Sequence, residues 1–206
     1  AGFANTYHDW RGNGGQGGLH EASNWTQYIY ENDEIIYMKE KGSPKLSWCA
    51  AISLGDSAMA SKDTDFLALK VAGSLTVQKG TSVNARNELR VTERGSVNLA
   101  GGSLFSERWV EIQAGGMLNG HGQIHSAFYN SGSLVLHPEN PLLIQGPVYL
   151  SGILKVEKAK RKMDLDKFVV IKAESIDGKF TNSEVSFDSK SYSIQYSSKE
   201  ITLLAQ

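Results

Sequence analysis

The sequence predicts an all-β protein whose centre is a parallel β-helix. A phrase of glycine, any residue and an aliphatic residue recurs five times, at glycine intervals of 22, 21, 16 and 20 residues. Repetition at about 20 residues is typical of solenoids, in which each coil buries its apolar side only against neighbouring coils. Aliphatic residues also alternate with polar ones in short runs, and no stretch keeps a helical period. The phrases begin at Gly73, Gly95, Gly116, Gly132 and Gly152.

Composition restricts the function classes. The 206 residues are enough for one substantial domain, and 40% hydrophobic with 21% charged residues is ordinary for a soluble globular protein. A net charge of −1 gives no reason to expect a nucleic acid or an anionic membrane surface as partner. We expect no membrane insertion, because no apolar run approaches about 18 residues. Cys49 is the only cysteine, so the chain can form neither an internal disulfide nor a cysteine-based zinc site.

The first elements should form an aromatic cap. Trp10 and Trp25 flank a glycine-rich stretch, and we expect them to pack with Trp48 in the first coil or its cap. From residue 35 onward come the alternating runs of the coils, each broken by glycine, serine, asparagine or charged residues. The aliphatic residues assigned to these runs include Leu67, Leu69, Val71, Leu75, Val77, Leu89, Val91, Val97, Leu99, Val110, Ile112, Leu118, Ile124, Leu134, Leu136, Val148, Leu150, Leu154 and Val156.

A β-sandwich is the competing architecture. Its hairpins would favour two-residue Asn-Gly or Asp-Gly turns, and of Asn119-Gly120 and Asp177-Gly178 only the second lies between clear strands. The repeated glycines fit the β-helix better, because a glycine at a coil corner can adopt a positive φ.

The final segment should close the solenoid. The sequence divides into residues 1–162, the β-helix with its N-terminal cap, and residues 163–206, a C-terminal β cap. Runs at 168–171, 192–196 and 201–204 are the predicted strands of this cap. It would cover the strand edges and core that the last coil leaves open.

Several motifs resemble a known family. Ala22-Ser23-Asn24-Trp25 is similar to the start of many secreted bacterial repeat proteins. The stretches 115–124 and 130–134 resemble autotransporter passengers and autotransporter-associated β-strand repeats, although 137–141 replaces their usual Pro-Gly. The resemblance implies a right-handed parallel β-helix and a secreted or cell-surface location in a bacterium. The start at Ala1, without methionine, fits an exported mature chain. Members serve as adhesins, surface layers and appendages of polysaccharide-degrading enzymes.

The sequence predicts no metal and no cofactor. His121 and His125 are four residues apart, which in a strand is roughly 13 Å and too far for one zinc ion. Asp63-Thr64-Asp65 begins like a calcium loop but lacks the later glycine and glutamate.

An exposed aromatic platform would suit a glycan, because the C–H faces of sugars stack on aromatic rings. Val110 and Ile112 should face inward, which turns Trp109 outward, and Tyr129 follows about one coil later. We therefore predict a non-catalytic, glycan-binding or adhesive and structural module, with a polysaccharide or cell-surface glycan as partner. The candidate ligand-binding residues are Trp109, Tyr129, Arg108, Arg90 and Glu111.

A polysaccharide lyase or glycoside hydrolase remains the enzymatic alternative. Arg90 and Glu111 could lie one coil apart on one face, either as part of a catalytic groove or as a ladder of solvated opposite charges. The sequence names no catalytic residue and does not decide between these, nor does it give the oligomeric state.

Overall fold

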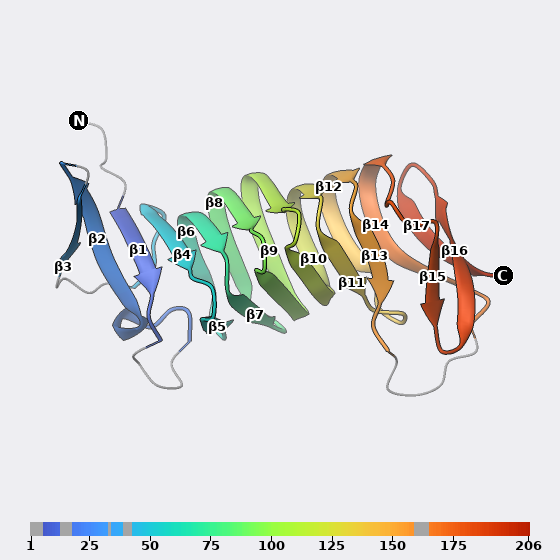
Figure 1. The fold of residues 1–206 in the computed structure, drawn as a ribbon, viewed down its shortest axis with the longest axis horizontal. Coiled ribbons are helices and arrows are strands. Elements are labelled where there is room, and N and C mark those ends of the chain that lie inside the picture. The colour runs from blue at the N-terminus through green and yellow to red at the C-terminus, as the bar shows by residue number, and fades with distance from the viewer. Residues whose placement is uncertain (1–5, 13–17, 33, 39–42, 159–164) are drawn as a thin grey trace.

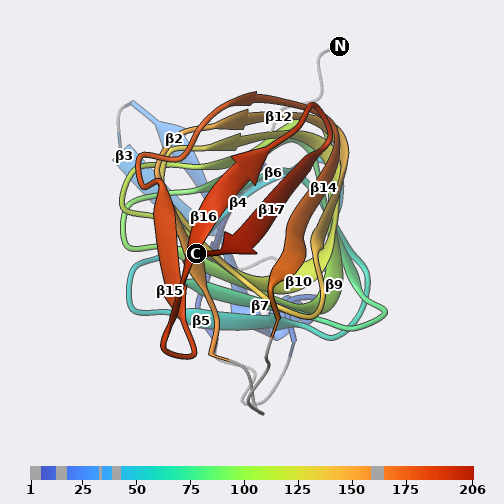
Figure 2. The same ribbon diagram turned by 90° about the vertical axis from the view of Figure 1, so that its right-hand side faces the viewer.

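The computed structural model describes residues 6–12, 18–32, 34–38, 43–158 and 165–206. In this part of the chain the strands stack along one axis into an elongated parallel β-helix (Figure 1), so the β-helix prediction is confirmed and the sandwich alternative is not adopted. Viewed from its C-terminal end, the coils superpose on one another (Figure 2). Within the described residues no helix is long and apolar enough to cross a membrane.

Each coil contributes strands to two sides of the solenoid, and the longer side bends at a further corner along its length. On the short-strand side, parallel pairing joins β5 (Ser57–Ala60), β7 (Ser74–Gln78), the first parts of β9 (Ser96–Ile112) and β10 (Met117–Asn130), β11 (Ser133–Leu136) and β13 (Ile153–Val156). On the long-strand side it joins β4 (Trp48–Ile52), β6 (Thr64–Val71), β8 (Ser82–Val91), the later parts of β9 and β10, β12 (Leu142–Leu150) and β14 (Lys167–Gly178).

The five glycine phrases mark one position in successive coils. Their aliphatic residues pair in register and form one buried column of Leu75, Val97, Leu118, Leu134 and Leu154. The expected reason for the glycines was only partly right, because a positive φ occurs at Gly152 alone among the five. At all five positions, a Cβ would instead come too close to carbonyl oxygens of the preceding coil, for example Val71 at Gly95.

The single short interval, between Gly116 and Gly132, arises only at coil corners. Compared with the coil before it, this coil has one residue fewer at the first corner, where Gly122 alone faces residues 101–102. It has two fewer at the second, where Ser126 faces residues 106–108, and two fewer at the third, where 131–132 faces 113–116. The strands therefore keep their register although the coil is five residues shorter.

The N-terminal cap is aromatic, as predicted. β1 (Thr6–Trp10) pairs with β4 and with β2 (Trp25–Glu31), which follows the short 3-10 helix η1 (Ala22–Asn24) and pairs with β3 (Glu34–Met38). Trp10, Trp25 and Trp48 are all buried, and Trp25 meets the other two edge to face at 5.5 and 5.7 Å between ring centroids. Trp10 and Trp25 each donate an indole N–H to a main-chain carbonyl, so burial leaves neither group unpaired.

The C-terminal cap is a set of antiparallel strands. β14 pairs in parallel with β12 and, through its first half, antiparallel with β17 (Glu200–Ala205). It is thus both the last long strand of the solenoid and the support for β15 (Glu184–Phe187), β16 (Lys190–Tyr196) and β17, which lie across the end (Figure 2). The expected boundary between residues 162 and 163 lies outside the described residues.

Candidate functional site

Outward side chains of the long-strand side form a continuous column along the solenoid. The register between strands places charged residues beside aromatic ones, one residue per coil. The column runs through Lys70, Arg90, Glu111, Tyr129, Tyr149 and Asp177. The inward neighbours Val110, Ile112 and Phe128 are fully buried, which fixes the outward orientation of the residues between them.

A second outward column lies two residues earlier on each strand and contains Glu88, Trp109 and Ala127 in register. The indole Nε1 of Trp109 donates a hydrogen bond of 3.2 Å to Glu88. The other carboxylate oxygen of Glu88 lies 3.4 Å from a guanidinium nitrogen of Arg90. Glu88 therefore holds both the tryptophan and the arginine in place.

Arg108 lies against the same tryptophan. Its guanidinium carbon is 4.7 Å from the centroid of the Trp109 ring, a cation–π geometry. Arg108 belongs to the three-residue corner 106–108, which faces only Ser126 in the next coil. The residue that follows Ser126 is Ala127, so only a methyl group lies next to the indole on that side.

These residues surround a shallow cleft of about 230 Å³, lined by Trp109, Glu111 and Tyr129. Tyr129 stacks on Tyr149 of the next coil with ring centroids 4.6 Å apart and an interplanar angle of 16°. The two tyrosines are 40% and 38% exposed, which is high for stacked rings. The cleft and the tyrosine pair together make an aromatic strip that runs along the solenoid axis.

All five sequence-predicted residues meet on this surface. Trp109, Glu111 and Tyr129 line the cleft, Arg108 covers part of the indole, and Arg90 is in register with Glu111 but pairs with Glu88. Sequence reasoning missed Glu88 and Tyr149. Tyr149 follows Tyr129 by 20 residues, so the coil period already pointed to it.

The other motifs serve local contacts. His125 stacks on Phe105 at 4.1 Å and contacts the side chains of Gln123 and Gln145. Asp63 accepts a hydrogen bond from the main chain of Ser82. Within the described ranges, no three His, Cys, Asp or Glu side chains gather closely enough to hold a metal ion.

Cys49 lies partly buried at the start of the second column, in register with Ala68. Burial and, to a lesser extent, the charge of Glu88 raise the pKa of its thiol. This favours the protonated and unreactive form.

Comparison of the chain with protein-family models, with curated proteins and with solved structures finds no match in any of the three.

Proposed function

We propose that this protein is a non-catalytic glycan-binding module, secreted or displayed at a bacterial cell surface. The observation that carries the proposal is the exposed cleft of Trp109, Glu111 and Tyr129, extended by the stacked Tyr149. A sugar ring has an apolar C–H face and a rim of hydroxyl groups. The aromatic rings suit the first, and the carboxylate of Glu111 and the guanidinium groups of Arg90 and Arg108 suit the second.

The shape of the surface favours a polymer over a small ligand. A volume of about 230 Å³ is below the ~300–1,000 Å³ of sites that enclose drug-sized molecules. The cleft is continuous with the tyrosine pair, and neighbouring strands are about 4.8 Å apart. From Trp109 on β9 to Tyr149 on β12 is two such steps, comparable with the length of two linked pyranose rings.

The carboxylates favour binding over hydrolysis. A glycosidase uses two carboxyl groups on either side of the scissile bond. Of the described residues that line the cleft, Glu111 alone carries a carboxylate, while both oxygens of the nearby Glu88 are engaged by Trp109 and Arg90. We therefore rank a polysaccharide lyase or glycoside hydrolase below the binding module, as the second candidate.

The sequence resemblance to autotransporter passengers and autotransporter-associated β-strand repeats supports the surface location and the adhesive or structural role. A protein exposed outside the cell meets polysaccharides directly. The parallel β-helix then serves as a rigid support, because each coil adds one further residue to each outward column.

The test is a glycan array and polysaccharide pull-down with wild type, Trp109→Ala and Tyr129→Ala. Phe105→Ala is the matched control, because Phe105 is an exposed aromatic on the same strand but outside the cleft lining. Reducing ends and absorbance of unsaturated products are measured on every ligand that binds. Binding that is lost in the two cleft variants and kept in the control, without product, supports the proposal. Product formation would replace it by the enzymatic alternative, and binding that survives both cleft variants would refute the site.

A further inference from the structure

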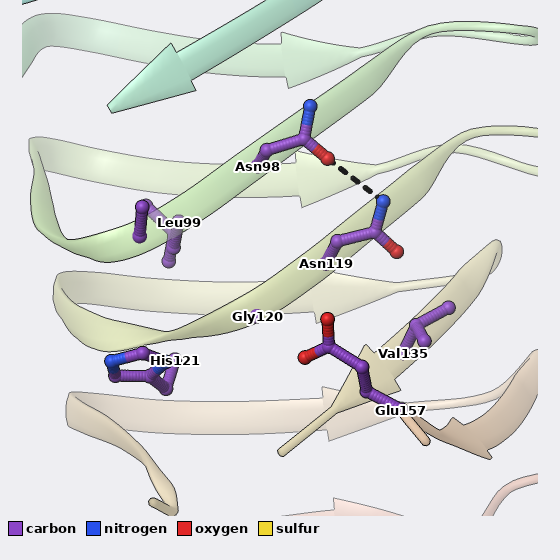
Figure 3. Close-up of a pocket in the computed structure, with 8 residues that line it drawn as sticks. Asn98, Leu99, Asn119, Gly120, His121, Val135 and Glu157 are labelled. Carbon is purple, nitrogen blue, oxygen red and sulfur yellow. Dashed lines mark hydrogen bonds between the residues drawn. The ribbon is translucent and has the colours of Figure 1, made fainter. Parts of the chain in front are cut away.

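A second hollow lies on the short-strand side, away from the residues of the aromatic cleft. It has a volume of about 380 Å³ and is lined by residues of four successive coils, those of β9, β10, β11 and β13 (Figure 3). Its lining consists of Asn98, Leu99, Ala100, Asn119, Gly120, His121, Val135 and Glu157. We call it the Gly120 groove.

Gly120, which has no side chain, is part of the lining of this groove. At the same register position the neighbouring coils carry aliphatic residues, Leu99 before it and Leu136 after it. Gly120 has a φ of 101°, and a Cβ there would collide with the carbonyl oxygen of Leu99. The position is therefore closed to any other residue, and the backbone of Gly120 stays accessible in the floor of the groove.

The wall of the groove holds polar groups in fixed positions. Asn119 donates a hydrogen bond of 2.8 Å from Nδ2 to Oδ1 of Asn98, and Asn98 donates in turn to Ser74. This ladder orients the Asn119 amide and leaves its Oδ1 as an acceptor. Figure 3 shows the Glu157 carboxylate near Gly120 and Val135, with Asn119 and His121 on either side.

His121 brings a donor and an acceptor. Burial lowers the pKa of its imidazole, and the neighbouring His137, whose ring centroid is 5.2 Å away, lowers it further. The negative charge of Glu157 raises this pKa, and the positive charge of Lys79 lowers it. The ring is therefore neutral at pH 7, with one N–H and one free ring nitrogen. Among the described lining residues Glu157 carries the one formal charge, and Lys79, which lies outside the lining, carries the opposite charge near His121.

We propose that the Gly120 groove is a second binding site, which takes a neutral sugar residue through its hydroxyl groups and makes the chain bivalent. A carboxylate accepts two hydroxyls of a vicinal diol, and the Asn119 oxygen and His121 take neighbouring ones. Val135 and Ala100, which are at least partly exposed, provide an apolar surface for the C–H face of the ring. The choice of a sugar rests on the proposed function, but the groove shares no lining residue with the aromatic cleft.

The test is a ¹⁵N–¹H NMR titration with methyl β-D-glucopyranoside, methyl β-D-galactopyranoside and methyl α-D-mannopyranoside. The Gly120 amide and the Asn119 side-chain amide report on the groove, and the Trp109 indole N–H reports on the cleft. We expect at least one of the three probes to shift the groove signals. Glu157→Gln should weaken that binding about tenfold, because it removes a charge-assisted acceptor, and should leave the Trp109 response unchanged. Glu174→Gln, at an exposed position on β14, is the control and should change neither response.

The outcomes separate the two sites. An unchanged affinity in Glu157→Gln, measured from the groove shifts, or the absence of groove shifts with all three probes, overturns the second site. A silent Trp109 indole beside a responsive groove counts against the proposed cleft and leaves the groove standing. Trp109→Ala should abolish cleft binding only, and lowering the pH far enough to protonate His121 should weaken groove binding only.

Discussion

Replacing Phe128 by alanine tests the inward and outward alternation on which the candidate surface depends. Phe128 is fully buried and lies in register between Val110 and Val148 of the adjacent coils, both also fully buried. Removing a buried phenylalanine costs about 3–5 kcal/mol, from lost transfer free energy and the cavity left behind. For a chain of 206 residues each kcal/mol corresponds to about 2–4 °C, so Tm should fall by about 6–20 °C.

The adjacent residue supplies the control. Tyr129 is also aromatic and directly follows Phe128 on the same strand, but it is 40% exposed on the outer column. Tyr129→Ala loses mainly its stacking with Tyr149, worth about 0.5–1.5 kcal/mol. Urea unfolding, followed by circular dichroism, compares the two variants. Equal losses of stability, or a larger loss for Tyr129→Ala, would show that the assigned orientation is wrong.

Three further predictions concern the cap, the cleft and the Gly120 groove. Asn182 forms hydrogen bonds with both the N–H and the C=O of Leu154 on β13 through its side-chain amide. Asn182→Ala should therefore lower the free energy of unfolding by about 1–3 kcal/mol in urea titrations. An unchanged urea midpoint would contradict this capping role. Glu88→Leu removes the hydrogen bond that holds the indole of Trp109. It should therefore alter tryptophan fluorescence and weaken glycan binding severalfold, with little loss of Tm. Unaltered glycan binding would count against the positioning role of Glu88. His121 should titrate by NMR with a midpoint below 6.5. Between that midpoint and about 6.5 the unfolded chain binds more protons at His121 than the folded chain, so the contribution of His121 to stability falls as the pH falls through this window. His121→Gln should remove this pH dependence of stability. A midpoint above 6.5 would refute the prediction.

The strand pattern made the coil interior predictable from sequence. Alternation at Val110 and Ile112 fixed the direction of Trp109 and Glu111, because side chains in a strand point to opposite faces in turn. The same rule failed for Leu67, which we grouped with Leu69 and Val71. A register shift between Phe66 and Ala68 turns Phe66 inward and leaves Leu67 partly exposed at a corner.

Contacts between coils were harder to predict, because they depend on corner lengths that follow no period. The hydrogen bond from Trp109 to Glu88 joins residues 21 apart, whereas the step from Glu111 to Tyr129 in the next coil is 18. No fixed repeat aligns both steps. The Gly120 groove was missed for a related reason: Asn119-Gly120 looks like a hairpin turn locally, and the other lining residues come mostly from three further coils.

Both hollows border the one short coil of an otherwise regular solenoid. At its first corner the coil narrows to Gly122, next to the open backbone of Gly120. At its second corner it narrows to Ser126, which sets the small Ala127 beside Trp109 while Arg108 of the longer corner lies over the indole. Because every shortening falls between strands, the buried columns stay in register and the core keeps its packing while the surface changes.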